Sequence, residues 1–280
     1  MRCIQRISIV LVASAFMLAF SSITIAAPVV FSAAGANPAS IQATVDAYRT
    51  ALGQLNANVA GSFGSGRREI NWDGVPAAMS APNNLAANFF NVNSPRGVVF
   101  TTPGTGFQVS ANAADGPVRF DNLNPAYSAQ FQTFSPQKLF TALGSNILDV
   151  NFFVAGSSTP ATVSGFGSVF TDVDLANTTS IEYFDQNNVS LGTFFAQAAN
   201  NGLSFLGVSF NAGERISRVR ITNGNLVIGP NENGTTSDVV VMDDFIYGEP
   251  TNVPEPTTMV LLGTGLAGIG AAVMKRQKRE

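Results

Sequence analysis

The chain has 280 residues, of which 45% are hydrophobic and only 12% are charged, which is about half the charged share of an average soluble domain. This composition predicts a packed core and turn-rich β structure rather than exposed charged helices. Histidine is absent and the only cysteine is Cys3, so the chain cannot build a Ser-His-Asp triad, a Cys-His pair, or a zinc site that needs histidine or several cysteines.

Residues 1–26 have the three parts of an export signal peptide. A short segment with two arginines precedes an apolar run over residues 7–20, and a stretch of small and polar residues leads to Ala27. We expect signal peptidase to cleave after Ala26, which removes the only thiol, that of Cys3. The alternative, an uncleaved membrane anchor, is disfavoured because the apolar run is shorter than a membrane span.

A lead segment over residues 27–66 has the apolar spacing of one amphipathic helix. Ser40 can cap the N-terminus of this helix. We expect the apolar face to pack against the domain that follows, because a single short helix needs tertiary support. The apolar residues recur at intervals of three or four and are Ile41, Val45, Tyr48, Leu52 and Leu55.

Short apolar runs separated by turn residues fill residues 67–249. Two of these runs flank the segment 185–188 (Asp-Gln-Asn-Asn), which predicts a β-hairpin with a polar turn. The region is therefore predicted to be all-β, an antiparallel β-sandwich similar to a jelly roll. The phenylalanines in its strand-like runs are expected between the sheets, and they are Phe152, Phe166, Phe170, Phe184, Phe205 and Phe210. The predicted strands are 69–72, 97–101, 106–110, 118–121, 147–154, 181–184, 189–195, 203–210, 216–221 and 239–247.

Residues 250–280 combine a proline-containing motif, an apolar run over residues 257–274 and a basic end. As a helix, 18 residues cover about 27 Å, which is just long enough to cross a bilayer. We therefore expect a single transmembrane helix, with the body outside the membrane and the basic end in the cytoplasm. The motif is Val253, Pro254, Glu255 and Pro256, and the basic residues are Lys275, Arg276, Lys278 and Arg279.

A Pro-Glu-Pro motif, a span that contains glycine and alanine, and a terminal basic cluster, in this order, resemble the PEP-CTERM sorting signal. The resemblance implies a protein of an exopolysaccharide-producing Gram-negative bacterium. It also implies that an exosortase, a membrane-embedded cysteine protease, recognises Pro254, Glu255 and Pro256 and processes the tail near them. The protein would be anchored in the membrane before processing, and then located at the cell surface or outside the cell. An ordinary C-terminal anchor after a proline-containing linker is the alternative.

The part of the chain expected outside the cytoplasm is acidic. Between Ala27 and Pro256 there are nine basic and seventeen acidic residues, so the net charge is −8. Such a surface repels nucleic acid and anionic membranes. It favours cations and neutral glycans, including exopolysaccharide, as partners.

Two pairs of aspartates near predicted strand ends form a candidate structural calcium site, the only cofactor that the sequence suggests. Asp172 and Asp174 lie on the same side of an extended chain, whereas Asp243 and Asp244 point to opposite sides, so only one of the second pair can join the first. Carboxylates and backbone carbonyls are the ligands that Ca²⁺ prefers. The strand around Asp243 is similar to the closing strand of some calcium-containing carbohydrate-binding modules. The alternative is that these aspartates are solvated or cap turns.

Asn71, Trp72 and Asp73 form a candidate glycan site at the junction of a predicted strand and a turn. An exposed indole can stack on a sugar ring, while its two neighbours hydrogen-bond the sugar hydroxyls. The alternative, which the usual burial of tryptophan favours, is a buried indole beside an Asp-Gly turn.

These features predict an exported, non-catalytic protein that acts in the cell envelope or matrix by adhesion or glycan binding. Two other functions remain open. One is a secreted polysaccharide-processing enzyme, which needs two carboxylates about 5 to 9 Å apart across a cleft. The other is a purely structural matrix component. A carboxylate-lined groove would favour the enzyme, and a buried Trp72 without such a groove would favour the structural component.

Overall fold

The computed structural model describes residues 27–210, 215–229 and 232–253. The predicted signal peptide over residues 1–26, the Pro-Glu-Pro motif and the predicted span over residues 257–274 lie outside the described residues. Within the described ranges, no helix is both long enough and apolar enough to cross a membrane.

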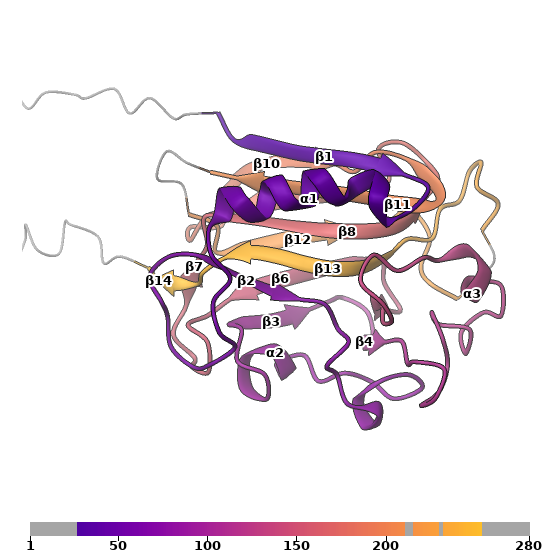
Figure 1. Ribbon diagram of the computed structural model, residues 1–280, viewed down its shortest axis with the longest axis horizontal. Helices are drawn as coiled ribbons and strands as arrows, with labels where there is room; N and C mark the ends of the chain where they lie inside the picture. The colour runs from indigo at the N-terminus through magenta and orange to yellow at the C-terminus, as the bar shows by residue number, and fades with distance from the viewer. Residues whose placement is uncertain (1–26, 211–214, 230–231, 254–280) are drawn as a thin grey trace, which may run out of the picture.

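Two antiparallel sheets form a sandwich, which confirms the predicted all-β fold (Figure 1). The seven-stranded sheet has the order β1 (Val29–Gly35), β11 (Ala199–Ser209), β8 (Gly165–Val173), β13 (Val241–Gly248), β5 (Phe140–Leu143) and β4 (Gly106–Val109), with β2 (Arg67–Ile70) also paired to β13. The five-stranded sheet has the order β10 (Ser190–Phe195), β9 (Ser180–Phe184), β12 (Arg218–Thr222), β6 (Ile147–Phe152) and β3 (Val98–Thr101), and β14 (Thr251–Asn252) pairs separately with β7 (Ala161–Thr162). The helical elements are α1 (Pro38–Leu52), η2 (Ala77–Met79), α2 (Phe89–Val92) and α3 (Tyr127–Gln130).

The main core fills the space between the two sheets. Trp72 stacks on Phe140 with ring centroids 4.0 Å apart, and Phe100 and Phe245 pack around this pair. Such aromatic contacts bury a large apolar area, which is the main source of stability in a sandwich. Among the phenylalanines predicted for this space, Phe152, Phe166, Phe170 and Phe210 belong to the inter-sheet cluster.

Phe205 was also predicted to lie between the sheets, and this was wrong. It points to the outer face of the seven-stranded sheet, where its ring lies 5.5 Å from that of Tyr48. Helix α1 covers this face (Figure 1), as its apolar spacing predicted, and buries Ile41 and Val45 there. The N-cap is Asn37 rather than Ser40, because the Asn37 side chain accepts a hydrogen bond from the Ser40 backbone N–H.

Two glycines let α1 approach the sheet closely. Gly167 of β8 and Gly207 of β11 are partners in the strand register, and both face the Tyr48 ring. A Cβ atom on Gly167 would come within 2.9 Å of the ring, and one on Gly207 within 3.1 Å. Because neither glycine has a side chain, the Tyr48 hydroxyl reaches the Val208 carbonyl and donates to it at 3.1 Å.

The strand predictions succeed where the signal is local. The hairpin of β9 and β10 is confirmed, and Asp185 Oδ1 accepts from the backbone N–H groups of Asn187 and Val189 in its turn. The predicted strand over residues 118–121 is wrong, because Arg119 and Phe120 adopt positive φ angles in a turn. Strand β1 was not predicted, and it places part of the lead segment in the sandwich by pairing with β11.

Candidate functional site

The indole of Trp72, in the candidate glycan site, is buried. Trp72 is only 1% exposed, lies between the sheets, and donates from Nε1 to the Asp243 carbonyl at 2.9 Å. Its ring therefore cannot stack on a sugar, and the favoured alternative, a buried indole, is the one observed. Asn71 is exposed and Asp73 is partly exposed, so these two neighbours reach solvent without the ring between them.

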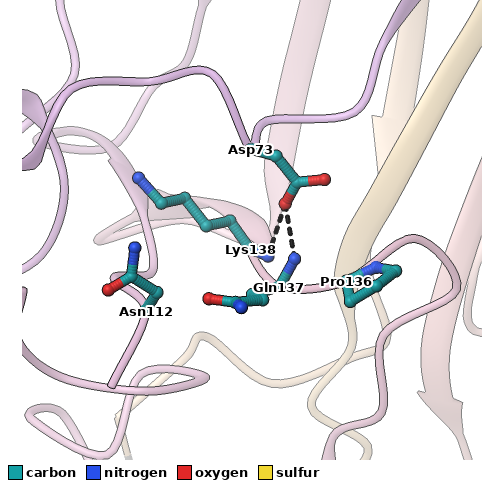
Figure 2. Close-up of a pocket in the computed structure, with 5 residues that line it drawn as sticks. All are labelled: Asp73, Asn112, Pro136, Gln137 and Lys138. Atoms are coloured by element: carbon teal, nitrogen blue, oxygen red, sulfur yellow. Dashed lines mark hydrogen bonds between the residues drawn. The ribbon is translucent and has the colours of Figure 1, made fainter. Parts of the chain in front are cut away.

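Asp73 instead lines a small polar pocket of about 200 Å³, together with Asn112, Pro136, Gln137 and Lys138 (Figure 2). Asp73 Oδ1 accepts from the backbone N–H groups of Gln137 at 2.5 Å and Lys138 at 3.1 Å. Burial raises the pKa of Asp73, and these two hydrogen bonds act in the opposite direction. The pocket combines one carboxylate with two side-chain amides.

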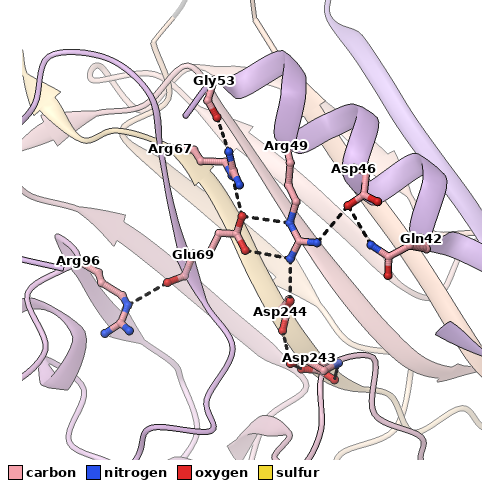
Figure 3. A network of polar contacts seen from close by, with 10 residues as sticks. Gln42, Asp46, Arg49, Gly53, Arg67, Glu69, Arg96, Asp243 and Asp244 are labelled. Carbon is pink, nitrogen blue, oxygen red and sulfur yellow. Dashed lines mark hydrogen bonds and ion pairs between the residues drawn. The ribbon is translucent and has the colours of Figure 1, made fainter. Parts of the chain in front are cut away.

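The Asp243–Asp244 pair belongs to a separate buried network (Figure 3). Asp243 Oδ2 accepts from the Phe134 backbone N–H at 2.6 Å, and Ser135 Oγ donates to Asp244 Oδ1 at 2.6 Å. Arg49 of α1 contacts Asp244 at 3.3 Å, so the network ties the helix to the sheet. Burial raises the pKa of both aspartates, that of Asp243 well above its usual range.

Neither aspartate of this pair joins Asp172 and Asp174, contrary to the prediction. The register of β13 against β8 shifts between Met242 and Phe245, and both carboxylates bond Ser135 on a neighbouring loop. The shift places both of them in the interior instead of sending one to each face. Their hydrogen bonds and the contact with Arg49 fit a structural role.

A different acid completes the predicted site. Asp172 near the end of β8, Asp174 just after it, and Glu232 in the segment before β13 each offer one carboxylate oxygen, and these oxygens lie within 4.8 Å of one another. We call these three residues the acid cluster. Sequence reasoning found two of them and missed Glu232, which stands alone in a polar, turn-rich segment 60 positions after Asp172.

An irregular stretch of backbone positions Asp172. Its φ angle is +66°, in the left-handed region that L-residues seldom adopt. The pairing of β11 with β8 is interrupted between Ala199 and Leu203, and there the Asn201 backbone N–H donates to Asp172 Oδ1 at 2.6 Å. Irregularities of this kind in a strand often redirect a side chain next to a functional site, and here the redirected side chain is that of Asp172.

A second layer of hydrogen bonds holds the other two acids. Asp238 Oδ1 accepts from the Asp174 backbone N–H at 3.1 Å, which fixes the turn after β8. Glu232 accepts from Gln130 Nε2 at 2.9 Å and from the Val239 backbone N–H. The acid cluster is therefore held by contacts outside the three carboxylates.

The three carboxylates destabilise each other's charged forms. Burial, followed by the charges of Asp172 and Asp238, raises the pKa of Asp174 to about 6. Burial, with a further contribution from Asp172, raises the pKa of Glu232 to about 8. The pKa of Asp172 is also raised, mainly by burial. Without a cation, the three carboxyl groups thus hold their protons to a higher pH than isolated carboxyl groups do.

The comparisons with known proteins concern the end of the chain. A search of curated proteins found no match. The family model described as the PEP-CTERM protein-sorting motif matches residues 252–277, which include Val253, the Pro-Glu-Pro motif and the basic residues Lys275 and Arg276. This motif implies export, processing by an exosortase and sorting to the cell surface. The chain therefore carries a PEP-CTERM sorting motif, which indicates an extracellular protein sorted by an exosortase.

Proposed function

We propose that this protein is a non-catalytic component of the cell surface or extracellular matrix, and that it binds a neutral glycan at the polar pocket. The observation that carries this proposal is a set of unused hydrogen-bonding groups. Asp73 Oδ2, the amide nitrogen of Asn112 and the side-chain amide of Gln137 have no hydrogen-bond partner among the described residues. Sugar hydroxyls both donate and accept, so they complement a carboxylate next to two amides.

The charges around the pocket favour a neutral ligand over an anionic one. The Lys138 ammonium group donates to the Val75 carbonyl at 2.5 Å and to Ser80 Oγ at 3.1 Å, so two of its three donors are already used inside the protein. Asp73 is the only carboxylate that lines the pocket, and the body as a whole is acidic.

The positions of the carboxylates support a non-catalytic role. A glycosidase holds two carboxylates about 5 to 9 Å apart on either side of the scissile bond. The pocket has one carboxylate, and the oxygens of the acid cluster lie within 4.8 Å of one another, with Asp172 buried. The pocket therefore lacks a second carboxylate, and the acids of the cluster are crowded together, without the space for a sugar that a glycosidase leaves between its two carboxyl groups.

A purely structural role is the second candidate, because Trp72 is buried in the core. The two candidates differ in whether the purified protein binds sugars. A structural component would bind none, whereas a glycan-binding protein would select neutral sugars and lose them when the pocket is altered.

The test is glycan-array binding by the exported protein, in calcium and in chelator. We expect Asn112→Asp, which keeps the acceptor of the Asn112 turn but removes the free donor, and Gln137→Ala each to weaken binding at least tenfold. Asn93→Ala is the matched control, because this asparagine is exposed and its side chain has no hydrogen-bond partner among the described residues. Binding to no glycan would favour the structural role, and release of cleaved sugars would favour the enzyme.

A further inference from the structure

The acid cluster contains carboxylate oxygens that are buried and have no donor. Asp172 is 2% exposed, and its Oδ2 atom has no amide, hydroxyl or cationic donor among the described residues; the Asn201 N–H is used by Oδ1, and the other hydrogen-bonding neighbour of the side chain is the carboxyl group of Glu232. Asp174 Oδ1 is likewise buried without a donor. A buried carboxylate oxygen without a partner is costly, and native proteins seldom keep one unless an ion or a water satisfies it.

The other buried acids of the described residues have cationic partners or several hydrogen-bond donors, and Asp238 and Asp243 belong to the second group. Glu249 pairs with Arg68 at 2.8 Å, and Asp244 contacts Arg49 at 3.3 Å. Within the described part of the chain, no lysine or arginine forms an ion pair with a member of the acid cluster. Three acids brought together without a basic residue match the protein contribution to a cation site.

We propose that the acid cluster binds one Ca²⁺ ion through Asp172, Asp174 and Glu232. Ca²⁺ takes six to eight oxygen ligands at about 2.3–2.6 Å, so two ligands on opposite sides of the ion are about 4.6–5.2 Å apart. The three oxygens lie within 4.8 Å of one another, so they can ligate one Ca²⁺ ion without a large rearrangement. Mg²⁺, at about 2.0–2.1 Å, would require a maximum separation of about 4.0–4.2 Å and a stricter octahedron.

The surroundings preorganise these oxygens. The Asn201 N–H holds one oxygen of Asp172, the hydrogen bonds of Asp238 fix the backbone at Asp174, and Val239 and Gln130 hold Glu232. Gly234 completes the space, because a Cβ atom there would come within 3.0 Å of Asp174 Oδ2. Asp174 and Glu232 are only partly buried, so water can reach the ion and supply its remaining ligands.

Binding would link the end of β8 to the segment that leads into β13. That segment is otherwise held mainly by hydrogen bonds within its own turn. For example, Asn233 Oδ1 accepts from the backbone N–H groups of Thr236 and Ser237. Extracellular calcium modules bind with dissociation constants of about 0.1–1 mM, and we expect this range for a site of three carboxylates and water. The ion would then stabilise the protein after export. This inference is independent of the glycan proposal, because it concerns different residues.

The test is calcium titration calorimetry and thermal denaturation of the purified exported protein after chelator treatment. We expect one Ca²⁺ per chain and a melting temperature that rises with calcium at constant ionic strength. Asp172→Asn and Glu232→Gln should each weaken binding at least tenfold and abolish the rise. In chelator, both variants should melt no lower than the parent protein, because each removes one of three crowded carboxyl groups that destabilise each other's charged forms.

Asp115→Asn is the matched control, since Asp115 is exposed and its side chain forms no hydrogen bond or ion pair among the described residues. This variant should bind calcium like the parent protein. Equal melting temperatures of the parent protein in calcium and chelator would overturn the proposal. So would an equal rise with magnesium, or an unchanged calcium response in the Asp172 and Glu232 variants.

Discussion

Replacement of Arg68 by methionine should strongly destabilise the protein, because Arg68 and Glu249 form a buried ion pair. The Arg68 and Glu249 side chains are 0% and 1% exposed, and they form two parallel contacts of 2.8 and 2.9 Å. Arg68 also donates to the carbonyls of Pro95 and Val59, at 2.7 and 3.0 Å. Its guanidinium therefore joins β2 to two loops and to the residue that follows β13.

The size of the effect follows from the charge left behind. Removal of one partner of a buried ion pair typically costs about 3–5 kcal/mol, because the other charge stays buried without compensation. In Arg68→Met, Glu249 would keep only the contacts from Asn56 Nδ2 at 2.9 Å and the Phe63 N–H at 3.3 Å. A domain of this kind has about 5–15 kcal/mol of stability in total, so this loss is a large share.

Urea unfolding measures this loss as a lower midpoint at an unchanged m-value. The double variant Arg68→Met/Glu249→Leu should be more stable than Arg68→Met, because it also removes the orphaned carboxylate. Arg220→Ala is the control: Arg220 is 44% exposed in its pair with Asp149, and its loss should cost about 1 kcal/mol or less. A cost below about 1 kcal/mol for Arg68→Met, or a double variant no more stable than the single one, would refute this reasoning.

Three further predictions follow. In chelator, the free energy of unfolding should fall as the pH rises from about 4.5 to 8. The pKa of Glu232 is raised to about 8 in the folded state, so the folded state binds more protons than the unfolded state in this window. Melting curves of Glu232→Gln should show a smaller fall over the same pH range. Gly167→Ala should lower the free energy of unfolding by about 1–3 kcal/mol, because it forces a methyl group against Tyr48. Gly74→Ala is the control: Gly74 has open space around it, so this variant should lose far less stability in the same urea assay. Alanines in place of residues 254–256 should leave export intact but cause uncleaved protein to accumulate in the membrane fraction; an unchanged mass and distribution in a host with an exosortase would contradict processing at this motif.

The sequence alone determined how the protein is sorted. The PEP-CTERM motif is a short linear segment, so its residues and their order can be read without knowledge of any distant contact. The amphipathic helix α1 and the hairpin of β9 and β10 were also predicted, because their signals are periodicity and turn chemistry over a few neighbouring residues. The predicted strand ranges did not include β8, although a strand end near Asp172 was expected; all nine residues of β8 are buried, so the segment shows no alternation of apolar and polar residues.

Only the tertiary structure decided which side chains meet. Asp172 and Asp174 were correctly paired by their spacing along one strand, but Glu232 reaches them through a turn whose path depends on contacts with α3 and with the residues before β13. Asp243 is in the interior because a register shift in β13 turns it toward Ser135. Burial of Trp72 likewise depends on Phe140, 68 positions away, stacking on its ring. Local sequence specifies what a side chain can do, whereas packing of distant segments determines what it contacts, because those contacts form only when the two sheets close on each other.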